Sequence, residues 1–333
     1  MGNKATQPRS FNTIRRSQTK VRAQRRVTQR IVLLAMFATV ALILVSLLVL
    51  GGFMIANAII DARSNNPNHS DDPSEPINDI VFVQTTKSAD AIHSGQLLLV
   101  NAENRYTFPA GLSLLRIYDN MPTTSNGSST IYRPVSNDYK LEAETLQALN
   151  TMMYKYYELD DSATFASSSA YRTLEDQEAL NSSVQPGYSD HHTGYCVAIQ
   201  YSDRSNLESD HWFYQNCYKY GFVVRYPEGK ESYTGVSDYK HCFRYVGVAH
   251  ATYMVENNLC LEEYVDLLKN NYNSSTKRLS IAAADGISYE IYYVAASGEE
   301  LTTLDVPSNY NYTVSGDNRS GFIVTVKKTA PAA

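Results

Sequence analysis

The first long hydrophobic stretch of the chain is residues 31–56, which contain no ionisable side chain and are rich in Leu, Val, Ile and Ala. As a helix, 26 residues would extend about 39 Å, which exceeds the roughly 30 Å of bilayer hydrocarbon. The pattern therefore predicts a transmembrane helix within residues 31–60. Residues 61–79 follow as a polar segment with three prolines, which is typical of a linker.

Beyond this linker, apolar residues recur at helical and strand spacings in turn, as expected of a mixed α+β domain over residues 80–270. Strands are predicted at residues 80–83, 97–100 and 195–200. Helices are predicted at residues 141–157, 208–220, 248–257 and 261–268, the second ending at Gly221.

After Asn270 apolar residues recur at every second position, which predicts a small all-β module over residues 276–328. Two strands are predicted at residues 278–284 and 287–294. Asp285-Gly286 between them is a strong signal for a β-hairpin. Phe322, Val324 and Val326 share one face of a last strand.

Charge is distributed unevenly along the chain. Residues 1–30 hold nine of the 29 basic side chains and no acidic one, so the rest carries 20 basic against 34 acidic groups. An acidic body repels phosphate, which argues against a nucleic-acid partner. Basic residues before a hydrophobic helix favour a cytoplasmic N-terminus. We therefore expect a single-pass protein of the cell membrane, with residues 1–30 as a cytoplasmic tail and the C-terminal domains extracytoplasmic.

The N-terminal sequence also fits two other patterns. Ala56-Asn57-Ala58 is similar to a signal-peptide cleavage site, but the apolar stretch is longer than a usual signal core. Met1-Gly2 with Thr6 fits the myristoylation pattern, although a chain that already spans the membrane gains little from a lipid. An uncleaved anchor is the favoured interpretation.

Side chains that could carry chemistry gather in motifs between residues 165 and 250. The two adjacent histidines at 191 and 192 are weak evidence alone, because such pairs are usually solvated or hydrogen-bonded in the core. The motifs are Ser169-Ala170-Tyr171-Arg172-Thr173 with Gln177, Pro186-Gly187-Tyr188-Ser189-Asp190-His191-His192-Thr193-Gly194, Tyr220-Gly221-Phe222-Val223-Val224-Arg225-Tyr226-Pro227, and Phe243-Arg244-Tyr245-Val246-Gly247.

In their order and spacing these motifs resemble the VanY-type D-alanyl-D-alanine carboxypeptidases, over about residues 97–268. These zinc enzymes remove the terminal D-Ala from peptidoglycan stem peptides. The resemblance implies a compact α+β domain with a small antiparallel sheet. It also implies a zinc ion held by His, Asp and a later His, with a Glu as the general base.

At the catalytic positions of that family this chain departs from the pattern. His191 matches the first zinc ligand, but Ala198 and Cys242 occupy the positions of the Asp and the second His. Tyr239 occupies the general-base position, and His241 that of a family Trp. An Ala methyl cannot bind metal, and a Tyr with an ordinary pKa of about 10 is no proton acceptor at neutral pH. The sequence therefore predicts a pseudoenzyme, most simply without a cofactor.

A substitute metal site stays open, because Cys196 and position 198 point to the same side of a strand. Within the family geometry, His191, Cys196 and Cys242 could bind zinc. Alternatively, Cys196 and Cys242 could form a disulfide on the exported side of the membrane, or stay as buried free thiols.

The resemblance places Arg172, Gln177 and Ser189 along the peptide cleft, where a guanidinium suits a D-Ala carboxylate. The favoured function is therefore binding of the stem peptide through its D-Ala-D-Ala terminus without cleavage. Two alternatives remain: an active zinc carboxypeptidase with altered ligands that releases D-Ala, and an interaction protein with an inherited, non-functional groove.

Overall fold

The structure is a computed structural model that describes residues 80–329, except residues 110, 111, 125, 126, 128, 209 and 238. The basic tail, the predicted transmembrane helix and the linker lie outside these residues. Within the described part of the chain, no helix is long and apolar enough to cross a membrane.

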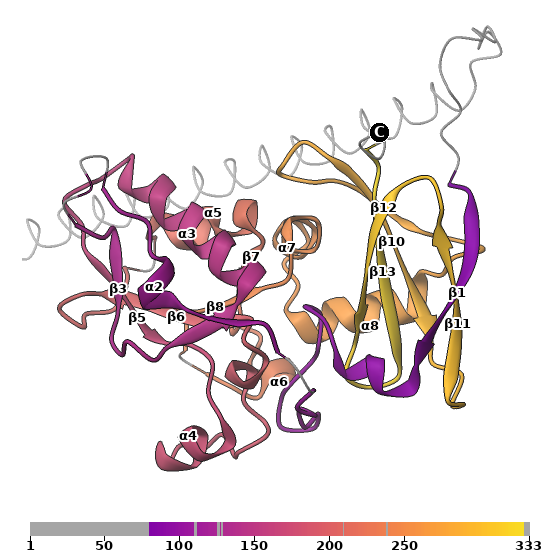
Figure 1. Ribbon diagram of the computed structural model, residues 1–333, viewed down its shortest axis with the longest axis horizontal. Helices are drawn as coiled ribbons and strands as arrows, with labels where there is room; N and C mark the ends of the chain where they lie inside the picture. Colours follow the sequence, from indigo (N-terminus) through magenta and orange to yellow (C-terminus); the bar gives the residue numbers. More distant parts are fainter. Residues whose placement is uncertain are drawn as a thin grey trace, which may run out of the picture. The chain divides into compact units, whose positions relative to one another are not determined.

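A five-stranded sheet forms the centre of the first half, in the order β3-β5-β6-β8-β7 (Figure 1). The strand β3 is parallel to β5, and all other neighbours are antiparallel. The strands are β3 Tyr132–Pro134, β5 Phe165–Ser169, β6 Cys196–Tyr201, β7 Phe222–Val224 and β8 Cys242–Tyr245. Together with the helices, this small, mostly antiparallel sheet confirms a mixed fold, and β6 confirms the strand predicted at residues 195–200.

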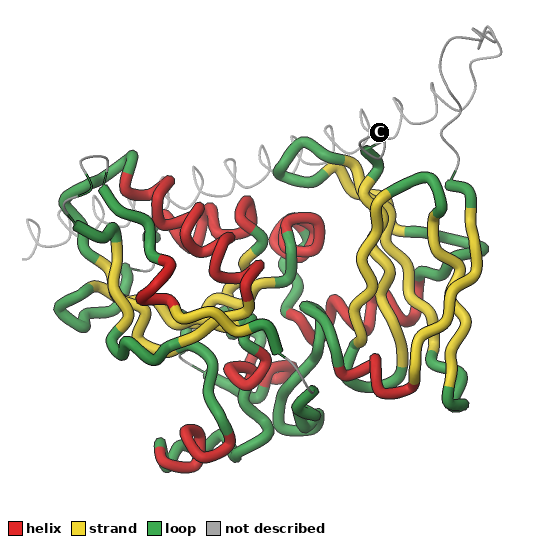
Figure 2. Tube along the Cα trace, in the orientation of Figure 1, coloured by secondary structure: helices red, strands yellow, loops and turns green. Residues whose placement is uncertain are grey.

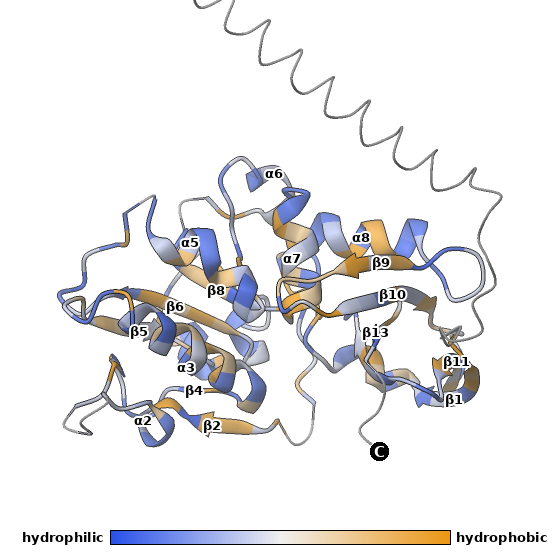
Figure 3. Cartoon of the chain, turned by 90° about the horizontal axis from the view of Figure 1, so that it is seen from above, coloured by the Kyte–Doolittle hydropathy of each residue, from blue (hydrophilic) through white to orange (hydrophobic). Residues whose placement is uncertain are grey.

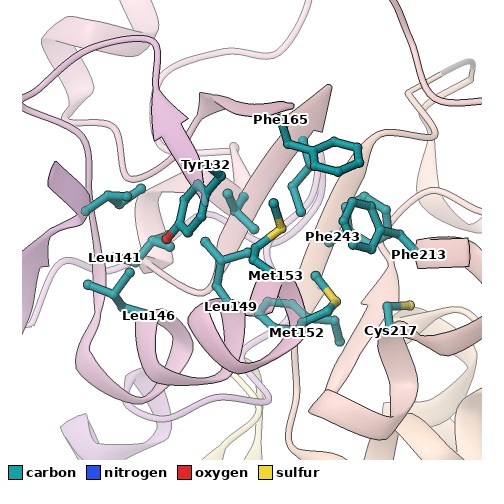
Figure 4. Close-up of a cluster of buried hydrophobic side chains, with 14 of the residues drawn as sticks. Tyr132, Leu141, Leu146, Leu149, Met152, Met153, Phe165, Phe213, Cys217 and Phe243 are labelled. Atoms are coloured by element: carbon teal, nitrogen blue, oxygen red, sulfur yellow. The ribbon is translucent and has the colours of Figure 1, made fainter. Parts of the chain in front are cut away.

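Helix α3 (Ala143–Tyr157) covers one face of the sheet (Figure 4). Leu146, Leu149 and Met153 recur at helical spacing and are buried against strand residues. The helix begins two residues later than predicted, because residues 140–142 form strand β4, which pairs with β2 (Leu114–Arg116). Helix α3 thus leaves the opposite face of the five-stranded sheet for the site.

Only the second part of the helix predicted at residues 208–220 is helical, as α5 (Trp212–Asn216) followed by the 3₁₀ turn η3 (Cys217–Tyr220). The ring of His211 caps its start by accepting a hydrogen bond from the Phe213 amide at 3.2 Å. Gly221 ends it as predicted, with φ of 84°. Further short helical elements include α2 Ile117–Asn120, α4 Leu174–Ala179, α6 Glu231–Thr234 and the 3₁₀ turn η1 Ala89–His93.

The strand predicted at residues 97–100 is wrong. These residues are buried, but they form a turn and an irregular stretch. Arginine side chains bind their carbonyls in place of a neighbouring strand: Arg244 donates to Leu98 and Arg225 to Val100, each at 3.2 Å. The backbone N–H and C=O groups of a buried apolar segment must form hydrogen bonds, but hydrophobic periodicity does not show which groups are their partners.

The C-terminal module contains two small sheets, ordered β12-β13-β10-β9 and β1-β11. Their strands are β1 Phe82–Ser88, β9 Leu279–Ala282, β10 Ser288–Ala295, β11 Leu301–Pro307, β12 Asn311–Gly316 and β13 Gly321–Lys327. The hairpin predicted at Asp285-Gly286 is confirmed, and Gly286 adopts φ of 78° in its turn. The strand predicted at residues 80–83 begins at Phe82 and pairs with β11, far away in the sequence.

Helices α7 (Val248–Glu256) and α8 (Leu261–Asn271) confirm the two helices predicted there. Helix α7 lies between the two groups of strands in Figure 2, and both helices share a core with β7, β9 and β10. On β13, Phe322, Val324 and Val326 share one face, as predicted, and pack in a separate core of the C-terminal module. Ile323 points to the opposite face and packs in the core with α7 and α8. Strands whose side chains are buried in the cores, such as β6 and β9, consist mostly of hydrophobic residues, drawn in orange in Figure 3.

Candidate functional site

The site lies on the face of the five-stranded sheet opposite α3. Val197, Ile199 and Phe243 point into the α3 core. Alternate residues of a strand point to opposite faces, so Cys196 and Ala198 of β6 lie on the other side with Cys242 of β8. Ala198 pairs directly with Cys242 across the two strands.

His191 is held by the 3₁₀ turn η2 (Asp190–Thr193), which ends at Gly194 with φ of 76°. Its Nδ1 lies 2.8 Å from the carbonyl oxygen of Ala170. A carbonyl only accepts hydrogen bonds, so Nδ1 carries the proton and Nε2 carries the lone pair, which faces the Tyr239 hydroxyl and the Cys242 thiol. Burial and the neighbouring Arg172 hold the pKa of His191 well below its usual value, which keeps the ring neutral.

Two cysteines converge on this nitrogen. Nε2 of His191 and the Sγ atoms of Cys196 and Cys242 all lie within 4.8 Å of one another, and all three residues are buried. Burial raises the pKa of the Cys242 thiol, and the neighbouring Cys196 thiol acts in the same direction. Both thiols are free in the structure, so the disulfide that the sequence left open is absent from it.

Tyr239, at the general-base position of the family, lies beside this cluster. Its Oη is 3.5 Å from Nε2 of His191, and its ring packs against His241 at a centroid distance of 4.5 Å. Burial raises the pKa of Tyr239 above its ordinary value. The phenol therefore stays protonated at neutral pH and can donate a hydrogen bond, but it does not accept a proton from water.

Arg172 is half-buried next to this cluster. Its Nε and Nη2 donate to Ser169 Oγ at 3.0 and 2.7 Å, and its Nη1 donates to Gln177 Oε1 at 2.6 Å. Among the carboxylates that the structure describes, none pairs with Arg172. Its charge is thus held in place by neutral partners.

Gln177 and Ser189 lie behind the site. Gln177 is 1% exposed, and its Nε2 donates to Ser182 Oγ and to the Val184 carbonyl, both at 2.9 Å. Ser189 is buried, and its Oγ accepts a hydrogen bond from the His191 amide at the start of η2. Gln177 therefore positions Arg172, and Ser189 positions His191.

His192 is a structural residue. Its Nδ1 lies 2.7 Å from the Arg172 carbonyl, and its Nε2 accepts from the Gly187 amide at 3.0 Å. Both ring nitrogens are occupied, and the ring packs edge-on against Phe108 at 5.1 Å. The hydrogen-bonded core interpretation of the adjacent histidines is thus correct for His192, whereas Nε2 of His191 faces the side chains of Tyr239 and Cys242 at the longer distances of 3.5 and 3.9 Å.

A buried network of charges supports the turn that carries His191. Asp190 pairs with both Arg225 and Arg244. Arg225 also donates to the two oxygens of Glu262 in α8 at 3.1 and 2.8 Å, and Arg244 donates to Thr193 Oγ1 at 2.9 Å. Burial alone would raise the pKa of Glu262, but Arg225 lowers it below its ordinary value.

Sequence reasoning did not predict this network, although a signal for it was present. Arg225 and Arg244 each stand within an apolar run, where an exposed arginine would be out of place. Both are fully buried. An arginine on the core side of a strand needs buried carboxylate partners, and only the fold shows that these are Asp190 and Glu262.

Comparison with known proteins agrees with this architecture. A sequence model of the VanY family, described as D-alanyl-D-alanine carboxypeptidase, matches residues 138–248. A D-alanyl-D-alanine carboxypeptidase of Enterococcus faecium is 30% identical over 258 residues, which cover 73% of this chain and 78% of that protein. The putative carboxypeptidase YodJ of Bacillus subtilis is 36% identical over 104 residues, 28% of this chain and 37% of YodJ.

Among solved structures, the vancomycin-resistance D,D-dipeptidase VanXYg, in complex with a D-Ala-D-Ala phosphinate analogue, is similar with a TM-score of 0.63 and 25% identity. The match covers 74% of this chain and 100% of VanXYg. Fold and motifs thus define a protein of the D-Ala-D-Ala peptidase class. The chain belongs to the VanY family of D-alanyl-D-alanine carboxypeptidases.

Proposed function

We propose that this protein binds the D-Ala-D-Ala terminus of peptidoglycan stem peptides at the outer side of the cell membrane and does not hydrolyse it. The observation that carries the proposal is the guanidinium of Arg172, fixed by Ser169 and Gln177 beside His191. A planar fork of donors suits a terminal carboxylate, and no described carboxylate competes for it.

The likeness to VanXYg supports this ligand class, because that enzyme is seen with a D-Ala-D-Ala phosphinate analogue. Affinity should be modest. One charge-assisted hydrogen bond contributes about 1.5–3 kcal/mol, whereas association itself costs at least about 4 kcal/mol. A few further contacts then give a dissociation constant on the order of 0.1–1 mM.

The residues around His191 support the absence of hydrolysis. Ala198 offers no metal ligand, and protonated Tyr239 replaces the family's general base. Loss of a general base alone costs about 10²–10⁴ in rate. Together with Cys242 at the position of the second His, these replacements remove the proton acceptor and alter the metal site.

The extracytoplasmic location is proposed from the sequence. The basic residues 1–30 and the apolar residues 31–56 support an uncleaved anchor with a cytoplasmic N-terminus. Protease added to intact cells should digest residues 80–333 and spare the tail. A mature protein that begins near Ile59 would contradict the anchor.

The binding test is a ligand-observed NMR titration of the full chain in detergent, with a chelator present, using acyl-Lys-D-Ala-D-Ala and its L-Ala-L-Ala counterpart. We expect selective binding of the D-Ala peptide. Arg172→Ala should weaken binding about tenfold or more, because the carboxylate loses its partner. Arg133→Ala is the matched control, since Arg133 is exposed on β3.

Three outcomes would contradict the proposal. An equal response to both stereoisomers, or none up to ~10 mM, would leave an inherited groove without a peptide ligand. Equal affinity of the native chain and Arg172→Ala would exclude the guanidinium as the anchor. Release of D-Ala at a rate that a chelator abolishes would instead establish an active metallopeptidase.

A further inference from the structure

We propose that His191, Cys196 and Cys242 bind a thiophilic divalent cation, Zn²⁺ in the first instance, through one imidazole and two thiolates. The set is shifted from the family's His, Asp and His, because Cys196 lies two residues before the Asp position. The proposal concerns the same region as the proposed function but does not rest on peptide binding.

The geometry of the three donor atoms fits such an ion. Zinc–sulfur bonds of about 2.3 Å and zinc–nitrogen bonds of about 2.0–2.1 Å place tetrahedral ligands about 3.6–3.8 Å apart. Nε2 of His191 and Sγ of Cys242 are 3.9 Å apart, and no pair among the three donors exceeds 4.8 Å. Small side-chain rotations therefore suffice to close the set around one ion.

The hydrogen bond from Nδ1 of His191 to the Ala170 carbonyl prepares the ring for a metal. It fixes the tautomer in which Nε2 carries the lone pair. Metal-binding histidines usually donate their other N–H to a carbonyl or carboxylate in this way, which also orients the ring.

Strand register explains how Cys196 replaces a ligand at position 198. Cys196 pairs with Arg244 and Ala198 pairs with Cys242, so Cys196 is the diagonal neighbour of Cys242 on the same face. The Ala198 side chain is only a methyl group, which leaves the space between the thiols unfilled by a longer chain. The Sγ atoms of the two cysteines lie within 4.8 Å of each other.

The chemistry of the donors selects the metal class. Two thiolates neutralise a divalent charge, and their binding releases the two thiol protons. Asp190, next to His191, is not available as a hard oxygen ligand, because Arg225 and Arg244 occupy its two oxygens. Sulfur and imidazole favour zinc over magnesium or calcium, which prefer oxygen.

The test uses the full chain in detergent, reduced and freed of metal, with Co²⁺ as a spectroscopic probe for Zn²⁺. We expect one Co²⁺ per chain, with a thiolate-to-cobalt charge-transfer band and the visible bands of a tetrahedral site, both displaced by Zn²⁺. Cys196→Ser and Cys242→Ser should each weaken metal binding more than about 100-fold. Loss of a group that only hydrogen-bonds a ligand already costs about 10–100-fold, and loss of the ligand itself should cost more. Cys217→Ser and Cys260→Ser are matched controls, since both residues are buried free cysteines outside the cluster.

A second measurement needs no variant. Zn²⁺ should slow alkylation of Cys196 and Cys242, read by peptide mass mapping, and leave Cys217 and Cys260 unchanged. Absence of the charge-transfer band in the reduced native chain would overturn the proposal. So would an unchanged band in the Cys196→Ser/Cys242→Ser double variant, or equal protection of all four cysteines. These readouts involve no peptide, so their failure is distinct from a failure of peptide binding.

Discussion

The two sides of the site differ in what their side chains can still do. On the anchoring side, Arg172 keeps its charge and is held by Ser169 and Gln177. On the hydrolytic side, Ala198 and Tyr239 occupy the positions that the motif resemblance assigns to a carboxylate ligand and a carboxylate base. Both sides meet at His191, which the same buried turn positions.

The difference shows that recognition and bond cleavage depend on separate groups. A guanidinium that binds a carboxylate needs only a fixed position and a constant charge. Water activation needs a proton acceptor of suitable pKa and an open metal position. Substitutions on one strand and one loop can therefore remove cleavage and leave the peptide anchor unchanged.

Restoring the hydrolytic side should have the largest effect. The triple variant Ala198→Asp/Tyr239→Glu/Cys242→His, supplied with Zn²⁺, should release D-Ala from a stem pentapeptide about 10²–10⁴ times faster than the native chain. Quantification of free D-Ala checks this. The same variant without Tyr239→Glu is the control and should stay near the native rate. A native chain as fast as the triple variant would show that the two sides are not separated.

Removal of the shared support should affect both sides. Asp190→Asn leaves Arg225 and Arg244 without their buried counter-charge, so the free energy of unfolding should fall by about 3–5 kcal/mol. Urea unfolding measures it. Asp266→Asn is the matched control, because its pair with Arg319 is exposed and should contribute less than about 1 kcal/mol. Equal effects of both substitutions would contradict a structural role of the network.

Low pH should reduce the free energy of unfolding through His250, a buried residue outside the site. Burial lowers the pKa of His250 to about 3, and both ring nitrogens are hydrogen-bonded, to Tyr264 and Thr325. The unfolded chain takes up this proton below about pH 6.5, so stability is full above that pH and falls as pH decreases toward 3. His250 should cost about 2 kcal/mol at pH 5.

The measurement is urea unfolding of the native chain and of His250→Gln at pH 7 and pH 5. The loss between the two pH values should be about 2 kcal/mol smaller in His250→Gln. The same loss in both proteins would mean that other groups govern the acid response. Because arginine stays charged throughout, peptide binding by Arg172 should persist wherever the chain is folded.

The smallest expected effect concerns the positioning of Arg172. Gln177→Met removes the 2.6 Å hydrogen bond to the guanidinium while keeping a similar volume, and should weaken peptide binding by about 1 kcal/mol, roughly fivefold. The NMR titration checks it, with Gln147→Met on the exposed side of α3 as control. An unchanged affinity would show that Ser169 alone holds the arginine.

Elements with a strong local signal were predictable. Helices α3, α7 and α8 and the hairpin at Asp285-Gly286 lie close to their predicted positions, because periodicity and turn residues are local properties. The strand predicted at residues 97–100 is not formed, for a physical reason. The backbone of these residues pairs with side chains of Arg225 and Arg244, more than a hundred residues away.

For the site, the sequence determined which residue types stand in the motif order, and hence the family and the predicted replacement of a carboxylate ligand and base. Only the tertiary structure decided which of these residues meet. It brought His191, Cys196 and Cys242 within 4.8 Å, gave Gln177 and Ser189 supporting roles, and buried two arginines around Asp190. Such contacts depend on strand register and on long-range charge pairing, which residue spacing within one segment does not encode.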